Sequence, residues 1–271
     1  MYRNTFLSVM FLACCFNGSL CAQSDAQIYE RTCDAKTYPF SDPSPVATPN
    51  NSYYPYFRFD GFSMQAQEKQ WKMVVLENDY VKLTVTPEIG GKIWGAIDKV
   101  NNKEFVYTNG VVKFRDVAMR GPWTSGGIEF NFGIIGHAPT CSTPIDYLTK
   151  KNVDGSVSCH IFSYEWITRT VWNVEINLPK DKAYFTTHTT WFNQSSIDQP
   201  YYQWMNAGYA TKTGTRFYYP GTYSIGHSGD LHPYPIDEEG RDVSWYDNNN
   251  FGASKSLHII GDYNDYFGVY W

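Results

Sequence analysis

Apolar and polar side chains alternate along much of the chain, which is the pattern of a β-strand with one buried face. The clearest run is residues 172–178, where Trp, Val, Ile and Leu alternate with Asn, Glu and Asn. Residues 81–85 show the same period of two, and residues 184–192 and 201–209 follow it between turn residues. No longer stretch has the spacing of an amphipathic helix. The pattern therefore predicts an all-β, antiparallel fold in the form of a sandwich or barrel.

The N-terminus has the layout of a secretory signal peptide over residues 1–22. Arg3 precedes an apolar run at residues 6–16, and small residues end the segment. The run is too short to span a bilayer comfortably. We therefore predict an exported protein, in the periplasm or at the cell surface, with no membrane span. The alternative is a lipoprotein acylated at Cys14, although Cys15 directly after it fits an acylation box poorly.

Two further segments follow the signal peptide. Residues 23–70 are rich in Pro, Ser, Asn and Tyr and keep no period for long, so we predict an extended lead-in along the main domain, with an edge strand at residues 54–59. Residues 71–271 carry the alternating pattern and form the main β-domain. Residues 265–271 have the pattern of a strand with no polar tail. We therefore expect the chain to be the front part of a longer protein, truncated at the C-terminus and with an incomplete groove.

The aromatic content is high, at 18% of the residues, with 22 Tyr, 17 Phe and 9 Trp. Aromatic side chains suit pleated strands, and they also stack on the apolar faces of sugar rings. The net charge is -5 and there is no cluster of Lys or Arg, so the chain lacks the positive field that attracts a phosphate backbone or anionic lipid. Composition therefore supports β structure, and nucleic acid is not expected as a partner.

Three of the six cysteines lie within the signal peptide, which leaves Cys33, Cys141 and Cys159 in the mature chain. An odd number permits one internal disulfide at most. The candidate pair is Cys141 with Cys159, and the alternative is two unpaired thiols. The spacing of His and Cys matches no zinc pattern, and the oxygen-rich stretch at residues 247–250 does not fit a calcium loop. We predict no metal and no other cofactor.

Residues 76–93 form a recognisable motif at the start of the main domain. In it a predicted strand is followed by Pro87, by the pair Gly90 and Gly91, and by a second strand leading to residues 98–105. This arrangement resembles the first hairpin of the galactose mutarotase-like superfamily. The paired glycines suit a tight turn with positive φ, which a Cβ atom would obstruct.

A closer resemblance lies in two further sequence motifs, which are residues 126–133, with His137 just after them, and residues 202–207. They resemble a bacterial domain family of unknown function within that superfamily, whose members are often followed by tetratricopeptide repeats. The resemblance covers roughly residues 70–271. It implies an antiparallel β-supersandwich, a shallow groove on one sheet and carbohydrate as ligand. It also implies a C-terminal repeat domain, outside this chain, as a partner.

The chain departs from true mutarotases at the positions where their catalytic pair is sought. The resemblance leads us to look for a His acid in a central strand and a Glu base close to the C-terminus. Trp204 and Asn206 stand where the His is sought, and the chain ends before the usual place of the Glu. This departure argues against simple mutarotase activity.

Residues 120–129 combine a cation, an aromatic ring and a carboxylate around three glycines. Arg120 could fork to a uronate or a hydroxyl pair, Trp123 could stack on a sugar ring, and Glu129 could act as an acid or a base. The simpler alternative is a glycine-rich turn in which Glu129 forms a salt bridge with Arg120. The sequence leaves both interpretations open.

His137 follows Glu129 by eight positions and could act as an acid or a proton shuttle, because its unperturbed pKa is about 6.5. The alternative is a buried histidine that is satisfied by the backbone. Trp204 and Asn206 share one face of a predicted strand, where a ring platform and an amide that binds hydroxyl groups would line a groove. The alternative for Trp204 is a place in the core.

The segment at residues 227–241 is long, polar and rich in titratable groups, among them His232 and the carboxylates of residues 237–239. It could form the rim of a groove, with one carboxylate facing Glu129 across a glycosidic bond. A solvated acidic turn is the simpler alternative.

The leading hypothesis is an exported carbohydrate-active protein that binds and processes oligosaccharide in a groove of the sandwich. Its reaction would be that of a glycoside hydrolase or a sugar epimerase-like enzyme. The candidates for proton transfer are Glu129 and His137. The side chains expected to hold the sugar are Arg120, Trp123, Trp204, Asn206 and His232. The alternative is a noncatalytic carbohydrate-binding domain of a larger protein, because the aromatic content is high and the mutarotase pair is missing.

Overall fold

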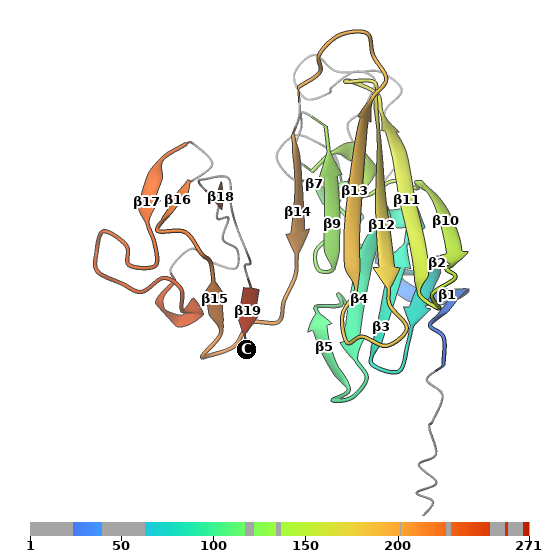
Figure 1. Ribbon diagram of the computed structural model, residues 1–271, viewed down its shortest axis with the longest axis horizontal. Helices are drawn as coiled ribbons and strands as arrows, with labels where there is room; N and C mark the ends of the chain where they lie inside the picture. The colour runs from blue at the N-terminus through green and yellow to red at the C-terminus, as the bar shows by residue number, and fades with distance from the viewer. Residues whose placement is uncertain are drawn as a thin grey trace, which may run out of the picture.

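The computed structural model describes eight segments of the chain, namely residues 24–39, 63–116, 122–133, 137–200, 202–225, 229–249, 258–259 and 268–270. Regular structure within them is β-strand, apart from three short 3-10 helices. Figure 1 shows a two-sheet sandwich and, beside it, a smaller lobe built from the C-terminal strands. The all-β, antiparallel fold predicted from the sequence is therefore confirmed. The predicted signal peptide, the predicted edge strand at residues 54–59 and Arg120 lie outside the described residues.

The larger sheet has eight strands in the order β14-β9-β4-β3-β2-β1-β6, with β5 paired to β4, and only the pairing of β6 with β1 is parallel. Its strands are β1 (Gln27–Tyr38), β2 (Gln67–Glu77), β3 (Val81–Thr86), β4 (Lys92–Asp98), β5 (Lys103–Val106), β6 (Val112–Lys113), β9 (Ile128–Phe132) and β14 (Gln203–Ala207). A separate pair of two-residue strands consists of β7 (Arg115–Asp116) and β8 (Pro122–Trp123).

The second sheet has four antiparallel strands, β10 (Asp146–Lys151), β11 (Val157–Glu165), β12 (Thr170–Leu178) and β13 (Thr186–Asn193). In Figure 1 its strands lie over those of the larger sheet, and one apolar core takes side chains from both sheets. Trp172 of β12 stacks on Phe132 of β9, with ring centroids 4.5 Å apart, and both side chains are buried. The core therefore joins the two sheets across their facing sides.

Strands β12 and β3 confirm the alternation read from the sequence. Along β12 every second side chain is buried, from Thr170 to Leu178, and the residues between them are partly exposed. In β3 the buried apolar positions are Val81, Leu83 and Val85, and Thr86 at the end of the strand is buried as well. A period of two places one row of side chains in the core and the other row toward solvent, which is why the pattern identified these strands.

Strand β1 is the main addition to the sequence-based description, because it lies inside the segment predicted as an extended lead-in. It pairs with β2 over eleven consecutive positions, from Gln27 opposite Glu77 to Thr37 opposite Gln67. Its other edge pairs with β6 at only two positions. Most of β1 is thus an edge strand, and its many exposed charged side chains suit an edge because they discourage pairing with other chains.

The hairpin recognised in the sequence is formed by β3 and β4. Between them, η1 (Pro87–Ile89) is a single 3-10 turn that ends at Gly90, with a φ of 66°. A Cβ atom on Gly90 would also collide with the backbone of Cys141, at the end of η2 (Pro139–Cys141). Glycine is needed here both for the left-handed turn and for the close approach of η2 to the hairpin.

The C-terminal strands build the smaller lobe, which Figure 1 shows beyond β14. Its elements are β15 (Arg216–Tyr218), β16 (Tyr223–Ile225), β17 (Leu231–Pro233), η3 (Tyr246–Asn248), β18 (His258–Ile259) and β19 (Gly268–Tyr270). Strand β16 lies between β17 and β18, and β15 pairs with β19. In the part of the chain that the structure describes, there is no helix of the length and apolarity needed to cross a membrane.

Candidate functional site

The outer face of the larger sheet carries polar side chains where β4 and β9 lie side by side. Ile93 of β4 is opposite Ile128 of β9, and both belong to the core between the sheets. Because successive side chains in a strand point to opposite faces, their chain neighbours Lys92 and Glu129 point away from that core. Both neighbours are nevertheless buried. A lysine and a glutamate are therefore enclosed on the outer side of the sheet.

Strand β14 extends the same face. Asn206 lies opposite Glu129, and Trp204 lies opposite Asn131. Directly opposed residues of antiparallel strands share one face, so these four side chains gather on one side of the sheet. Trp204 is partly exposed and Asn206 is exposed. The face thus passes from a buried carboxylate on β9 to side chains that solvent can reach on β14.

The centre of this face is a pair of residues, Glu129 and His137, which we call the dyad. Oε1 of Glu129 lies 2.9 Å from Nδ1 of His137 and accepts a hydrogen bond of 2.7 Å from Nδ2 of Asn131. An ionised carboxylate can only accept, so Nδ1 is assigned the proton. The Asn131 amide is oriented in turn, because its oxygen accepts a hydrogen bond of 2.9 Å from the backbone N–H of Ala138.

Burial distinguishes the two members of the dyad. The side chain of Glu129 is 2% exposed, and that of His137 is 18% exposed. Oε2 of Glu129 is buried and has no hydrogen-bond partner among the described residues. A buried carboxylate oxygen without a partner is costly, and the thiol of Cys141 is the neighbouring donor that interacts with this carboxylate. A ligand would meet His137 first, with Glu129 behind it.

Two tryptophans frame the imidazole of His137. Its ring lies edge-on to Trp204, with centroids 4.7 Å apart, and edge-on to Trp123, with centroids 6.0 Å apart. The backbone of His137 has a φ of 48°, in the left-handed region that few residues other than glycine adopt. Such a conformation persists where the surrounding structure enforces it, and it is frequent at functional sites. The ring is thus held in place by both its backbone and its aromatic neighbours.

A buried lysine stands next to the dyad. Nζ of Lys92 donates to the carbonyl oxygen of Thr124 at 2.5 Å and contacts the hydroxyl oxygen of the same residue at 3.1 Å. Burial lowers the pKa of Lys92, and the negative charge of Glu129 opposes that shift. The hydrogen bonds to Thr124 satisfy the ammonium group, and the negative charge of Glu129 favours its charged form.

The Cys141 thiol is buried on the same side of the sheet. Burial raises the pKa of Cys141 well above its usual value, and the charge of Glu129 raises it further. The proposed disulfide between Cys141 and Cys159 is not formed, since these two residues and Cys33 are all free thiols. The two buried thiols belong to different environments, because Cys159 lies in the core between the sheets.

We expect Cys33 to be the only one of these three thiols that is alkylated in the folded protein. Cys33 is partly exposed, whereas Cys141 and Cys159 are buried, and burial raises the pKa of Cys159 to about 12. The thiolate is the reactive species, so a raised pKa slows the reaction as well as burial does. Iodoacetamide labelling at pH 8, followed by peptide mass spectrometry, measures this. Denatured protein serves as the control, and rapid native labelling of Cys141 would show that its burial is wrong.

Gly127 lies close to the Lys92 side chain and leaves no room there for a Cβ atom. Its φ is 67°, and a Cβ atom there would collide with the carbonyl oxygen of Ile93 and lie 3.2 Å from the Lys92 side chain. We expect Gly127→Ala to lower the free energy of unfolding by about 1–3 kcal/mol more than Gly214→Ala does. Gly214 is the matched control, because its φ is 85° but no atom lies within 4 Å of its Cβ position. Urea denaturation measures both, and equal losses would contradict the predicted collision.

The structure brings together five residues that the sequence analysis singled out: Trp123, Glu129, His137, Trp204 and Asn206. The alternative interpretation of His137, as a histidine satisfied by the backbone, does not hold, since its Nδ1 lies 2.9 Å from a carboxylate oxygen of Glu129. The alternative for Trp204, a place in the core, does not hold either, because it lies on the outer face and is partly exposed.

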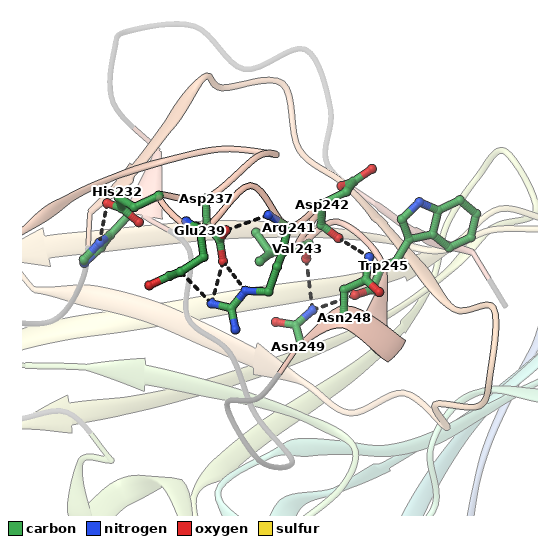
Figure 2. Close-up of polar contacts among 10 residues, drawn as sticks. His232, Asp237, Glu239, Arg241, Asp242, Val243, Trp245, Asn248 and Asn249 are labelled. Carbon is green, nitrogen blue, oxygen red and sulfur yellow. Dashed lines mark hydrogen bonds and ion pairs between the residues drawn. The ribbon is translucent and has the colours of Figure 1, made fainter.

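His232 lies away from the dyad, on β17 of the smaller lobe. Its Nδ1 is 3.5 Å from a carboxylate oxygen of Glu238, and both side chains are about half exposed. Figure 2 shows that Arg241 binds the carboxylates of Asp237 and Glu239, at 2.6 Å and 2.7 Å. In Figure 1 this lobe and strand β9 are separated by β14. These carboxylates therefore serve the turn of the lobe and do not face Glu129.

The described residues contain no group of three His, Cys, Asp or Glu side chains placed to hold a metal ion. In the oxygen-rich stretch near residue 247, the amide groups are used in local structure, as Figure 2 shows. Asn248 donates to the carbonyl oxygen of Asp242 at 2.9 Å, and Asn249 donates to that of Val243 at 2.9 Å.

Sequence reasoning missed four polar residues of this site: Lys92, Thr124, Asn131 and Cys141. Asn131 could have been found, because it lies two positions after Glu129 in a predicted strand and so shares its face. Lys92 carried a weaker signal, as a charged residue between a glycine pair and an apolar strand. Thr124 lies in the candidate segment of residues 120–129, but nothing in the sequence relates it to Lys92, and no local pattern relates Cys141 to Glu129, since these contacts depend on the folded loops.

The model of a domain family of unknown function, DUF5107, matches residues 48–271. The chain belongs to this family. Among solved structures, it is similar to a TPR-domain containing protein from Parabacteroides distasonis ATCC 8503, with 24% sequence identity and a TM-score of 0.71. The match covers 81% of this chain and 38% of that protein, so the family member described here spans well under half the length of its structural relative. At this identity the likeness concerns the fold.

Proposed function

We propose that this DUF5107 domain binds oligosaccharide on the outer face of its larger sheet and processes it by proton transfer through His137. The observation that carries the proposal is the dyad, a partly exposed imidazole between two tryptophan rings with a buried carboxylate behind it. Tryptophan rings stack on the apolar faces of sugars. An imidazole beside such a platform is placed to exchange a proton with a hydroxyl or glycosidic oxygen.

The two members of the dyad have different roles in this proposal. With Nδ1 of His137 donating to Glu129, the lone pair on Nε2 can take a proton from a sugar hydroxyl or a water. The imidazolium that results is stabilised by the adjacent carboxylate, and it can return the proton to a leaving oxygen. Glu129 is thus a positioning residue, because it is too buried to touch a sugar. Asn206, exposed on β14, is placed to bind a hydroxyl group.

The reaction class we propose is that of a glycoside hydrolase or a sugar epimerase-like enzyme, since both need proton transfer at sugar oxygens. We also propose the wider relationship to the galactose mutarotase-like superfamily. It is supported by the β3–β4 hairpin with its left-handed glycines and by the position of the polar face on the larger sheet. The dyad lies on β9 and the loop after it, which differs from the pair sought in mutarotases.

A noncatalytic carbohydrate-binding domain is the second candidate. It is favoured by one observation, the burial of Glu129, which removes the carboxylate from direct contact with a substrate. In that case the tryptophans would hold the sugar and the dyad would only orient Trp204. The two candidates differ in pH dependence, because turnover through the dyad follows its ionisation whereas stacking on tryptophan varies little between about pH 5 and 8.

We further propose that the protein is exported to the periplasm or cell surface and works beside a repeat domain. Export is supported by residues 1–22, in which a positively charged residue, an apolar run and small residues follow one another. The second is supported by the TPR-domain containing relative, of which the matching region is only a part. A carbohydrate-binding sandwich next to a repeat domain would join sugar recognition to a protein partner.

The test is a titration of the chain from residue 23 with neutral and acidic plant and mucin oligosaccharides, followed by intrinsic tryptophan fluorescence. Each mixture is then analysed for new reducing ends and altered anomers. Binding with new products, and a rate that follows one ionisation between about pH 5 and 8, is expected. Binding without products at any pH would favour the noncatalytic candidate, and the absence of binding throughout the panel would contradict the proposal.

A further inference from the structure

One face of the smaller lobe carries an arginine among aromatic rings. Arg216 of β15 lies directly opposite Tyr270 of β19, and on its other side it forms a β-bridge with Trp245. Directly opposed residues of antiparallel strands share one face, so these three side chains form a row across the lobe. Tyr218 follows Arg216 by two positions in β15 and therefore lies on the same face. Opposite Tyr218 stands Gly268, beside which space is open. We call Arg216, Tyr218, Trp245 and Tyr270 the aromatic row.

The guanidinium of Arg216 lies over two rings of the aromatic row. Its Cζ is 4.8 Å from the ring centroid of Trp245 and 5.3 Å from that of Tyr218. Cation–π contacts of this kind orient the side chain and leave the N–H groups at the edge of the guanidinium free to donate. Two backbone hydrogen bonds, of 2.8 Å and 2.9 Å, tie the segment around Trp245 to β15. The cation is therefore held in place before any ligand binds.

Arg216 has donor capacity that the described residues do not use. A guanidinium donates several hydrogen bonds and accepts none. Among the described residues its acceptor is the hydroxyl oxygen of Ser244, 3.4 Å from Nε, and no carboxylate of these residues forms an ion pair with it. Asp242 instead accepts from the backbone N–H and the hydroxyl of Ser244, at 3.0 Å and 2.6 Å. Asp247 accepts from the backbone N–H of Gly214 at 2.8 Å. The charge of Arg216 is thus left for an anion from outside.

The rings of the aromatic row are open to solvent. Tyr270 is 70% exposed, Tyr218 is 43% exposed and Trp245 is 36% exposed. In Figure 2 the indole of Trp245 points away from Arg241 and the carboxylates that bind it. A row that only stabilised the lobe would gain from burying its rings, because a cation–π contact is stronger when it is desolvated. Exposed rings beside an unpaired cation suit a ligand that has both an apolar face and an anionic group.

We propose that the aromatic row is a second carbohydrate-binding surface, which takes a sugar that bears a carboxylate, as uronic and sialic acids do. The carboxylate accepts a forked pair of hydrogen bonds from Arg216, the geometry in which arginine binds carboxylates best. The apolar face of the sugar ring stacks on Tyr270. The row lies on the smaller lobe, apart from the dyad, so the inference shares with the proposed function only the class of ligand.

The experiment is an NMR titration of the ¹⁵N-labelled protein, following the Nε–H of Arg216 and the indole N–H of Trp245. Each acidic probe has a neutral counterpart: trigalacturonic acid is compared with its methyl ester, and sialyllactose with lactose. We expect one acidic probe to shift both resonances and to bind about tenfold or more tightly than its counterpart. The two pairs distinguish a uronate from a sialic acid.

Three results of this titration would overturn the proposal. The first is the absence of a shift with both acidic probes. The second is equal affinity for an acidic probe and its neutral counterpart, because Arg216 would then not contribute its charge. The third is binding of a triglutamate peptide as tightly as of either acidic sugar, because the row would then recognise an acidic peptide.

Variants test the two contacts separately. Arg216→Gln should weaken binding of the acidic probe by about tenfold or more. Tyr270→Ala should weaken it by about fivefold, and it leaves both cation–π contacts of Arg216 in place, so it serves if Arg216→Gln fails to fold. The matched control is Tyr223→Ala, because Tyr223 is 51% exposed on β16 of the same lobe, and it should bind as the wild type does. Unchanged affinity in a folded Arg216→Gln or Tyr270→Ala protein would contradict the assignment.

The same titration separates this inference from the proposed function. If the acidic probe shifts Trp245 and no sugar shifts His137 or Trp204, the aromatic row binds carbohydrate and the function proposed for the dyad fails. If sugars shift His137 and Trp204 but never Trp245, the function of the dyad stands and the row has only a structural role.

Discussion

A His137→Gln variant is expected to lose turnover of its oligosaccharide by about 10²–10⁴-fold and to keep most of its affinity. Glutamine can still donate a hydrogen bond to Glu129 and fill the space between the tryptophans, but it cannot accept and return a proton. The loss should therefore appear in kcat rather than in KM. Steady-state product formation, measured for the oligosaccharide found by the fluorescence titration, checks this.

His188→Gln is the matched control, since His188 is an exposed histidine on β13 of the other sheet. It should leave both kcat and KM unchanged. A His137→Gln protein with full turnover would contradict the assignment of the proton-transferring group. Loss of binding together with turnover would instead place His137 among the residues that hold the sugar.

Trp172→Ala is expected to lower the free energy of unfolding by about 3–5 kcal/mol. Trp172 is fully buried and stacks on Phe132 with an interplanar angle of 10°, so its truncation would leave a cavity at the centre of the contact between the sheets. A loss of this size is a large share of the stability of a typical domain. Urea denaturation followed by far-ultraviolet circular dichroism measures it.

Trp166→Ala is the control for that experiment, because Trp166 lies in the turn between β11 and β12 and is 59% exposed. We expect it to change the free energy of unfolding by less than about 1 kcal/mol. Similar losses for both tryptophans would mean that the sheets do not pack through Trp172.

The strands that bury one face in full could be predicted from the sequence, and the edge strand that buries only a few side chains could not. One face of β12 lies in the core and the other is partly exposed to solvent, so apolar and polar residues alternate along it. Strand β1 is an edge strand whose exposed positions occur on both faces, and its charged residues resemble a loop. Its place is fixed by eleven backbone pairings with β2, which leave no hydrophobic pattern.

The candidate site was predictable as a set of residues, but its arrangement was not. Glu129 and His137 were singled out because their side chains can transfer protons, yet only the fold shows that one is buried and the other partly exposed. The smaller lobe illustrates the opposite case. His232 and its neighbours have suitable side chains, but they bind one another in a local turn. The sequence identifies candidate residues by their side-chain chemistry, and the packing of distant segments determines which of them lie together.

We expect a sugar to bind at the dyad and its two tryptophans. The direct measurement is a two-dimensional NMR titration of the ¹⁵N-labelled protein with the oligosaccharide that gives the largest fluorescence change, following the side-chain resonances of His137, Trp123 and Trp204. We predict that these three shift together with a single dissociation constant, while the resonance of Trp166, in the turn between β11 and β12, does not move. Shifts confined to the smaller lobe, with His137 and Trp204 unchanged, would contradict the claim.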